Sequence, residues 1–233
     1  MTIREALQIP EGLTAVIGGG GKSSLLIRLG QELGPERVRE MAVRLGFGRA
    51  LNLADTLSTA AGQLPEAETL TSSGAFANFC FGQGELLATP IQIAAMMNTI
   101  AAGGIWREPL FLECTLDETT GEPLTALAHR GARRVFSAQT ARALRELLAS
   151  VVTEGTGHEA APTESTAAGK TGTAQTGQFA AGKELKNYWF AGFYPARNPR
   201  YTIVVLQDGQ TGPSRTSAAI FARVCDALDT AGE

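Results

Sequence analysis

Apolar residues recur at helical spacing in five stretches of the chain, and each stretch predicts a helix. The first follows a glycine run at residues 18–21, the second begins at Pro35, the third at Pro90, the fourth after Ser137, and the last covers residues 214–228. Thr89 and Ser137 are suitable N-caps for the third and fourth helices, and Pro35 and Pro90 suit a first helical position. The predicted inward faces are Leu25, Leu26 and Leu29; Val38, Met41, Ala42 and Leu45; Ile93, Ala94, Met97 and Ile100; Leu144, Leu147, Leu148 and Val151; and Ala218, Phe221, Ala222, Val224 and Cys225.

The remaining apolar runs are short and rich in β-branched and aromatic residues, as in strands. Residues 188–194 and 201–206 predict two strands joined by a turn, and the strand before them carries Lys170. The continuous apolar run at 201–206 indicates burial on both faces. Residues 118–122 predict a hairpin tip. Together these patterns predict an α+β fold with an antiparallel sheet flanked by helices.

Composition narrows the function classes. The 233 residues carry a net charge of −3 with scattered arginines, so we expect no nucleic-acid partner. Three cysteines, Cys80, Cys114 and Cys225, lack short paired spacing, so we expect free thiols, no metal and no cofactor. The chain shows neither a signal-peptide pattern nor a run of about 20 apolar residues, and as written it is expected to be cytoplasmic.

The run from Ala168 to Gln175 carries the most specific chemistry in the sequence. Lys170 would place a fixed positive charge opposite a carboxylate, and the hydroxyls of Thr171 and Thr173 would bind that carboxylate and the adjacent backbone. Gly172 has no Cβ, so a substrate strand could lie close against the edge. These four residues are the predicted substrate-binding site.

Several segments, in order, surround this run, and together they resemble the transpeptidase domain of penicillin-binding proteins. They are Phe81 to Gln92 with its Gly-Gln-Gly turn and Thr-Pro helix start, Ala101 to Gly104, Glu154 to Gly157, Lys170 to Gln175, and Trp189 to Pro195. The resemblance implies the serine β-lactamase and transpeptidase fold over residues 28–233. It also implies peptidoglycan stem peptides ending in D-Ala-D-Ala, or β-lactams, as partners. Family members act at the outer face of the cytoplasmic membrane. Gln83 and Gly84 would either line the outer wall of the site or form a structural turn.

Two of the family's three catalytic elements are absent from the sequence. Three positions before the four lysines stand Gly19, Ala167, Ala180 and Lys183, so no Ser-x-x-Lys nucleophile motif exists. No serine stands two positions before an asparagine either, so Ser-x-Asn is missing. We therefore identify no catalytic residue, and we expect an N-terminally truncated transpeptidase domain that is unable to acylate.

The first 27 residues are predicted to be a foreign or divergent segment. Residues 13–26 read as strand, glycine loop and helix, and they resemble a short P-loop in which Gly20, Gly21, Lys22 and Ser23 would hold phosphate. The segment could be a foreign start, a working nucleotide site or a divergent domain.

Three functional hypotheses follow. The chain is a truncated penicillin-binding transpeptidase domain, a P-loop nucleotide-binding protein, or a noncatalytic module that binds cell-wall peptide or self-associates. Self-association would use the strand Tyr201 to Leu206, because an apolar strand without a neighbour favours pairing.

Overall fold

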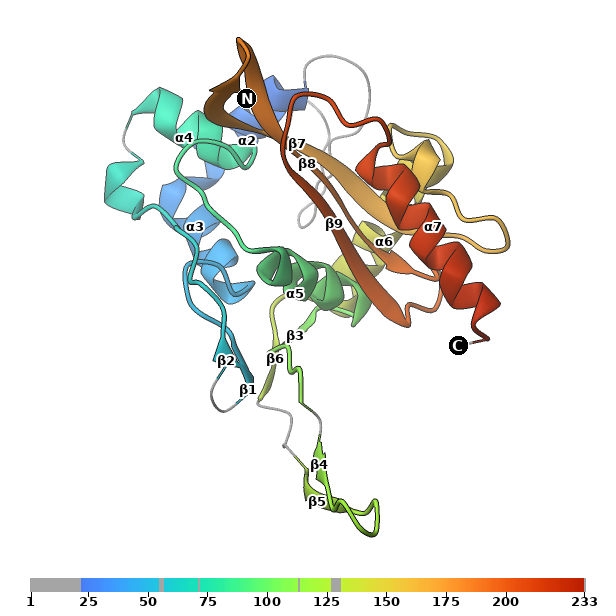
Figure 1. Cartoon of the computed structure of the whole chain (residues 1–233). Helices are drawn as coiled ribbons and strands as arrows, with labels where there is room; N and C mark the ends of the chain where they lie inside the picture. Colours follow the sequence, from blue (N-terminus) through green and yellow to red (C-terminus); the bar gives the residue numbers. More distant parts are fainter. Residues whose placement is uncertain (1–21, 55–56, 71, 113, 127–130, 233) are drawn as a thin grey trace.

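A three-stranded antiparallel sheet lies at the centre of the molecule, with strand order β7-β8-β9. The structure is a computed structural model that describes residues 22–232 apart from 55–56, 71, 113 and 127–130. The strands are β7 (Ala168–Ala180), β8 (Lys183–Tyr194) and β9 (Tyr201–Gln210). This is the antiparallel sheet that the sequence predicts, although β7 and β8 continue further into their shared hairpin (Figure 1).

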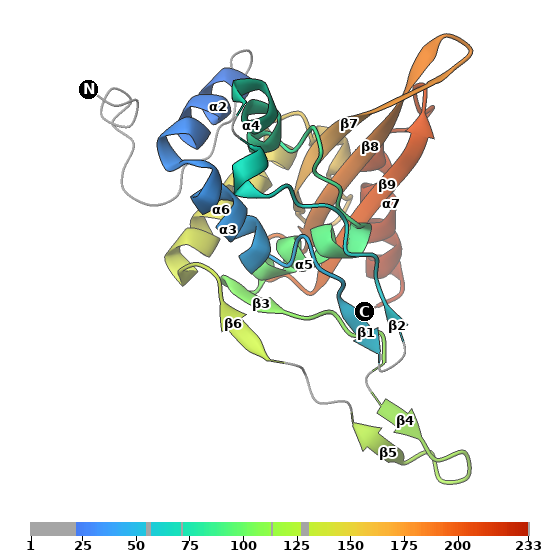
Figure 2. The same cartoon turned by 90° about the vertical axis from the view of Figure 1, so that its left-hand side faces the viewer.

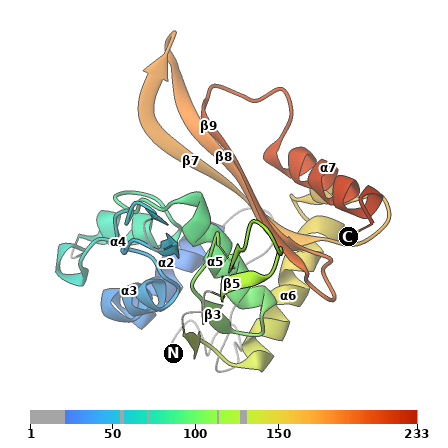
Figure 3. The ribbon, with the colours of Figure 1, turned by 60° about the horizontal axis from the view of Figure 1, so that its bottom comes forward.

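Helices cover both faces of this sheet, which confirms the α+β architecture. Helix α7 (Ser217–Thr230) lies along one face, and α5 (Pro90–Ala101) and α6 (Ala138–Thr153) lie against the other (Figure 3). Helices α2 (Lys22–Leu33), α3 (Pro35–Arg44) and α4 (Ser73–Cys80) form a separate group beyond α5 (Figure 3). No helix in the described part of the chain is long and apolar enough to cross a membrane.

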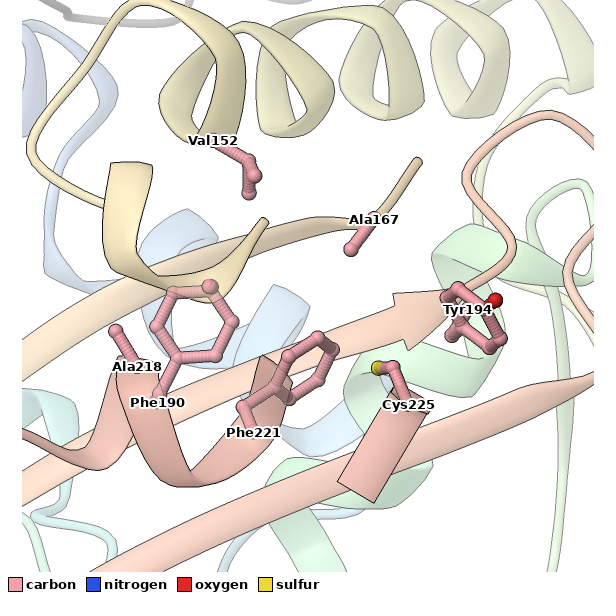
Figure 4. Close-up of a cluster of buried hydrophobic side chains, with 8 residues drawn as sticks. Val152, Ala167, Phe190, Tyr194, Ala218, Phe221 and Cys225 are labelled. Carbon is pink, nitrogen blue, oxygen red and sulfur yellow. The ribbon is translucent and has the colours of Figure 1, made fainter. Parts of the chain in front are cut away.

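The face of the sheet under α7 is packed with aromatic side chains. Phe190 of β8 and Phe221 of α7 are fully buried, and their ring centroids are 4.7 Å apart (Figure 4). Cys225 and Tyr194 extend the same cluster toward the end of α7 (Figure 4). Burial of this many large side chains makes α7 and the sheet one cooperative unit.

Alternation along the strands sends the other side chains toward α5 and α6. Phe193 and Ala191 of β8 join Met97 and Ile100 of α5 in a second buried cluster. On β9, Tyr201, Ile203 and Val205 pack under α7, whereas Val204 packs against the second cluster. Both faces of the strand 201–206 therefore contact the core, but its side chains are only partly buried, because β9 is an edge of the described sheet.

The predicted helix starts are confirmed where capping residues marked them. Thr89 and Gln92 form a reciprocal capping box at the start of α5, and Ser137 caps α6 through the Thr140 N–H. Met41 of α3 and Val224 of α7, both predicted to face inward, are exposed. The last helix begins at Ser217, three residues later than predicted, because the Thr216 hydroxyl caps it through the Ala219 N–H.

Helix α4 was not predicted, because residues 47–83 show no apolar periodicity. Phe76 and Phe79 of α4 are nevertheless buried in a small cluster with Leu70. The helix also packs on α2, where a Cβ on Gly30 would lie 2.2 Å from Cys80 Sγ. Close contact between two helices, rather than a regular stripe, determines this part of the fold.

Short strands complete the described chain. A hairpin arm, β4 (Cys114–Leu116) with β5 (Pro123–Ala126), extends away from the body and contains the predicted tip at 118–122 (Figure 2). The base of the arm is β3 (Ile105–Arg107) paired with β6 (Ala132–Arg134). The remaining elements are β1 (Asn52–Ala54), β2 (Leu57–Ser58), η1 (Ala67–Thr69) and η2 (His158–Ala160).

Candidate substrate-binding site

Strand β7, which carries Lys170 to Thr173, is an edge of the sheet. It pairs with β8 on one side, and in the described part of the chain no strand pairs with its other side. In an antiparallel ladder the N–H and C=O of one residue point to the same side, and successive residues alternate. The edge strand therefore presents the backbone groups of every second residue away from β8.

Hydrogen bonds show which residues of β7 direct their backbone groups away from β8. The Thr173 carbonyl accepts a hydrogen bond from Gln83 Nε2 at 3.1 Å, and Gln83 lies outside the sheet. Thr173 and, two residues earlier, Thr171 thus direct their backbone groups outward, whereas Lys170 and Gly172 direct theirs toward β8. The predicted substrate strand would meet β7 at these two threonines.

The Lys170 side chain bends around to this same edge. Its Nζ lies 2.9 Å from the Thr171 carbonyl oxygen and 3.2 Å from Thr171 Oγ1. The charge is exposed and is therefore accessible to an anionic group. The structure thus brings the ammonium and the first predicted hydroxyl together.

A second hydroxyl lies beside Thr171. Thr156, in the loop after α6, places its Oγ1 3.4 Å from Thr171 Oγ1. The sequence analysis noted Thr156 only as part of a resembling segment, and its role beside Thr171 was missed. A Gly-Thr-Gly spacing carries no signal of that contact, because the 14 residues between the threonines fold back through η2.

Two glycines of β7 differ in how closely their neighbours pack against them. A Cβ on Gly169 would lie 2.5 Å from the Phe190 ring, so Gly169 supports the strand from behind. At Gly172 an added Cβ would meet only Trp189, at 3.4 Å, which is ordinary contact. Gly172 is thus not needed for β7–β8 packing.

Gln83 is held in place by its own turn. The flanking glycines Gly82 and Gly84 both have positive φ, 77° and 80°, and the Gln83 N–H donates to the Asn78 carbonyl at 2.9 Å. The turn is therefore fixed to the end of α4 and directs the Gln83 side chain at β7. Of the two alternatives for Gln83, this contact favours a place in the wall of the site.

The predicted phosphate loop lies mostly outside the described residues. Gly20, Gly21 and the predicted strand 13–17 lie outside the residues that the structure describes. Lys22 and Ser23 are the first residues of helix α2. Helix α2 runs continuously through position 27, where the sequence analysis placed a domain boundary. Among the described residues no group of acidic, histidine or cysteine side chains could hold a metal ion.

The chain is similar to known proteins in sequence and in fold. A family model described as "Penicillin binding protein transpeptidase domain" matches residues 22–226. Penicillin-binding protein PbpB of Mycolicibacterium smegmatis is 33% identical over 98% of this chain and 37% of its own length. Stage V sporulation protein D of Bacillus subtilis is 30% identical over 85% of this chain and 30% of its own length.

Solved structures show the same relationship. Penicillin binding protein 3 of Mycobacterium tuberculosis, complexed with aztreonam, superposes with a TM-score of 0.77 at 30% identity, covering 90% of this chain and 49% of that one. The same protein complexed with ampicillin gives 0.75 at 31% identity, over 88% and 48%. The chain thus spans about a third to a half of the relatives that it matches. Over residues 22–226, it belongs to the penicillin-binding protein transpeptidase domain family.

Proposed function

We propose that the β7 edge binds the carboxyl-terminal end of a peptidoglycan stem peptide, or a β-lactam that imitates it. One observation carries the proposal: the Lys170 ammonium, the Thr171 hydroxyl and the outward backbone of Thr173 lie along the edge of β7 that faces away from β8. The ammonium would bind the carboxylate, and the edge would pair with the peptide backbone. Relatives solved with aztreonam and ampicillin support the β-lactam as a ligand class.

We propose further that these 233 residues by themselves bind such a ligand noncovalently. The sequence holds neither Ser-x-x-Lys nor Ser-x-Asn, and removing the nucleophile of such a site commonly costs many powers of ten in rate. The site of action would be peptidoglycan, outside the cytoplasm, as for the relatives named peptidoglycan D,D-transpeptidases. The comparisons give no support to the expectation of a cytoplasmic protein.

Fluorescence polarisation of a fluorescent penicillin tests the proposal. Lys170→Met should weaken binding about tenfold or more, because a charge-assisted hydrogen bond is lost. Lys183→Met removes the same charge from the distal hairpin of β7 and β8 and should leave binding unchanged. Equal affinities for the two variants would refute the site, and a stoichiometric covalent adduct in the intact mass would refute noncovalent binding.

We also propose that β9 pairs with a second copy of the chain. In the described part of the chain β9 pairs only with β8. The alternation that turns Thr173 outward on β7 also directs the backbones of Thr202, Val204 and Leu206 away from β8.

Light scattering on Thr202→Pro tests the pairing. Proline removes one outward N–H without removing a bond to β8, so a dimer formed through this edge should dissociate. Thr202→Val keeps the N–H and should remain dimeric. A wild-type monomer at all concentrations, or a dimer unaffected by the proline, would contradict the proposal. Val204 is unsuitable for the test because its side chain packs in the core.

A further inference from the structure

The outward carbonyls of the proposed binding edge are already occupied by the protein's own side chains. Lys170 Nζ donates to the Thr171 carbonyl, and Gln83 Nε2 donates to the Thr173 carbonyl. A peptide that extends the sheet would donate its own backbone N–H groups to these oxygens. The two side chains therefore stand where ligand donors would bind.

The hydrogen bonds of Lys170 and Gln83 to the edge carbonyls differ in what must move when a ligand replaces them. Lys170 neighbours its acceptor along the chain, and its ammonium can turn to a ligand carboxylate without leaving the edge. Gln83 reaches Thr173 from 90 residues away, across from the α4–α5 turn to the sheet. Because its backbone is anchored to Asn78 between two glycines of positive φ, only its side chain can move readily.

We propose that Gln83 is a displaceable latch, which closes the β7 edge in the unliganded protein and must leave Thr173 before a peptide strand can pair there. This inference rests on the proposed peptide-binding function and adds a gating residue to the same site. The hydrogen bond that closes the latch contributes little free energy, because Gln83 is only half-buried and its contact with Thr173 is exposed to water.

A competing hydrogen bond lowers apparent affinity by the fraction of molecules in which it is open. An exposed neutral hydrogen bond keeps the closed state in excess by a factor of roughly three to ten. Gln83→Ala should therefore bind a peptide ending in D-Ala-D-Ala, and the fluorescent penicillin, roughly three- to tenfold more tightly than wild type. The gain should lie in the association rate, because the closed state no longer has to open first.

Two variants sharpen the comparison. Gln83→Met keeps the length of the side chain, adds no charge and cannot donate to a carbonyl, so it should also bind more tightly than wild type. Gln175→Ala removes a glutamine of the β7–β8 hairpin, whose amide donates to Glu184 Oε2 at 3.0 Å rather than to an edge carbonyl. This control should bind as wild type does.

The Gln83 side-chain amide signals in a ¹⁵N NMR spectrum give a second readout, assigned by their absence in Gln83→Ala. On titration with the peptide they should shift toward the values of a solvent-exposed glutamine. If wild type binds and Gln83→Ala binds equally or more weakly, or if ligand shifts β7 signals and leaves these unchanged, the latch is wrong while the binding edge stands. If neither wild type nor any folded variant binds, the binding edge itself is wrong and the latch with it.

Discussion

The hydroxyl of Tyr194, at the end of β8, donates a hydrogen bond to the carboxylate of Asp229 near the end of α7, 2.5 Å from Oδ1. Tyr194 is buried and Asp229 is exposed, so the bond joins the sheet to the helix at the rim of the aromatic cluster. At the other end of α7 the Ser217 hydroxyl donates to the Tyr188 carbonyl of β8 at 2.8 Å, so the two contacts together fix the position of the helix along the strand.

Tyr194→Phe should lower the free energy of unfolding by about 1 to 2 kcal/mol, because a hydrogen bond to a charged group is lost while Asp229 is rehydrated. Urea unfolding followed by circular dichroism measures this change. Tyr201→Phe deletes the same atom from a half-buried tyrosine on β9 and should stay within about 0.5 kcal/mol of wild type. Equal losses for the two variants would contradict a special role for the pair.

The same contact predicts an alkaline pH dependence. Burial, together with the Asp229 hydrogen bond and charge, raises the pKa of Tyr194 to about 12, against about 10 in an unfolded chain. The unfolded state loses this proton first, so the stabilising contribution is complete below pH of about 10 and is lost as pH rises toward 12. The melting temperature of wild type should therefore fall more steeply than that of Tyr194→Phe over this interval. Parallel curves would show that Tyr194 does not contribute.

Gln92 is expected to be the most sensitive polar residue outside the sheet. It is fully buried in α5, and its Nε2 lies within 3.3 Å of the carbonyls of Gly46, Arg49 and Ala61. Gln92→Leu leaves these carbonyls without the donor and should cost about 3 kcal/mol or more, measured by denaturant unfolding.

The control for that variant is Gln63→Leu. Gln63 is exposed, and its backbone makes the bridge to Leu87, so its side chain should matter by less than about 0.5 kcal/mol. A stable Gln92→Leu protein would mean that the segment 46–63 does not depend on this side chain.

Two glycines of the central sheet should respond differently to alanine. At Gly192 the new Cβ would lie 2.3 Å from the Ala168 carbonyl oxygen, so Gly192→Ala should cost about 3 kcal/mol or more. At Gly172 the nearest atom is 3.4 Å away, so Gly172→Ala should change stability by less than about 1 kcal/mol. Thermal unfolding separates the two.

At Gly172 we expect the alanine substitution to change the affinity for ligand rather than the stability. If a substrate strand lies close against this edge, the added methyl group should weaken penicillin binding by about an order of magnitude in a protein of unchanged stability. Unchanged affinity in Gly172→Ala would remove Gly172 from the proposed site.

The sequence by itself determined the elements whose signals are local. Thr89, Pro90 and Ser137 marked helix starts because capping is decided within one turn. The aromatic and β-branched runs marked β8 and β9, and the order of segments around Lys170 identified the family before any fold was known.

Only the tertiary structure decided which distant groups meet. Helix α4 forms against α2 without apolar periodicity, and Gln92, polar in a predicted apolar helix, proves to be fully buried. At the candidate site, Thr156 and Gln83 reach β7 from 15 and 90 residues away. Such contacts depend on how the elements pack, and spacing along one chain carries no record of that packing.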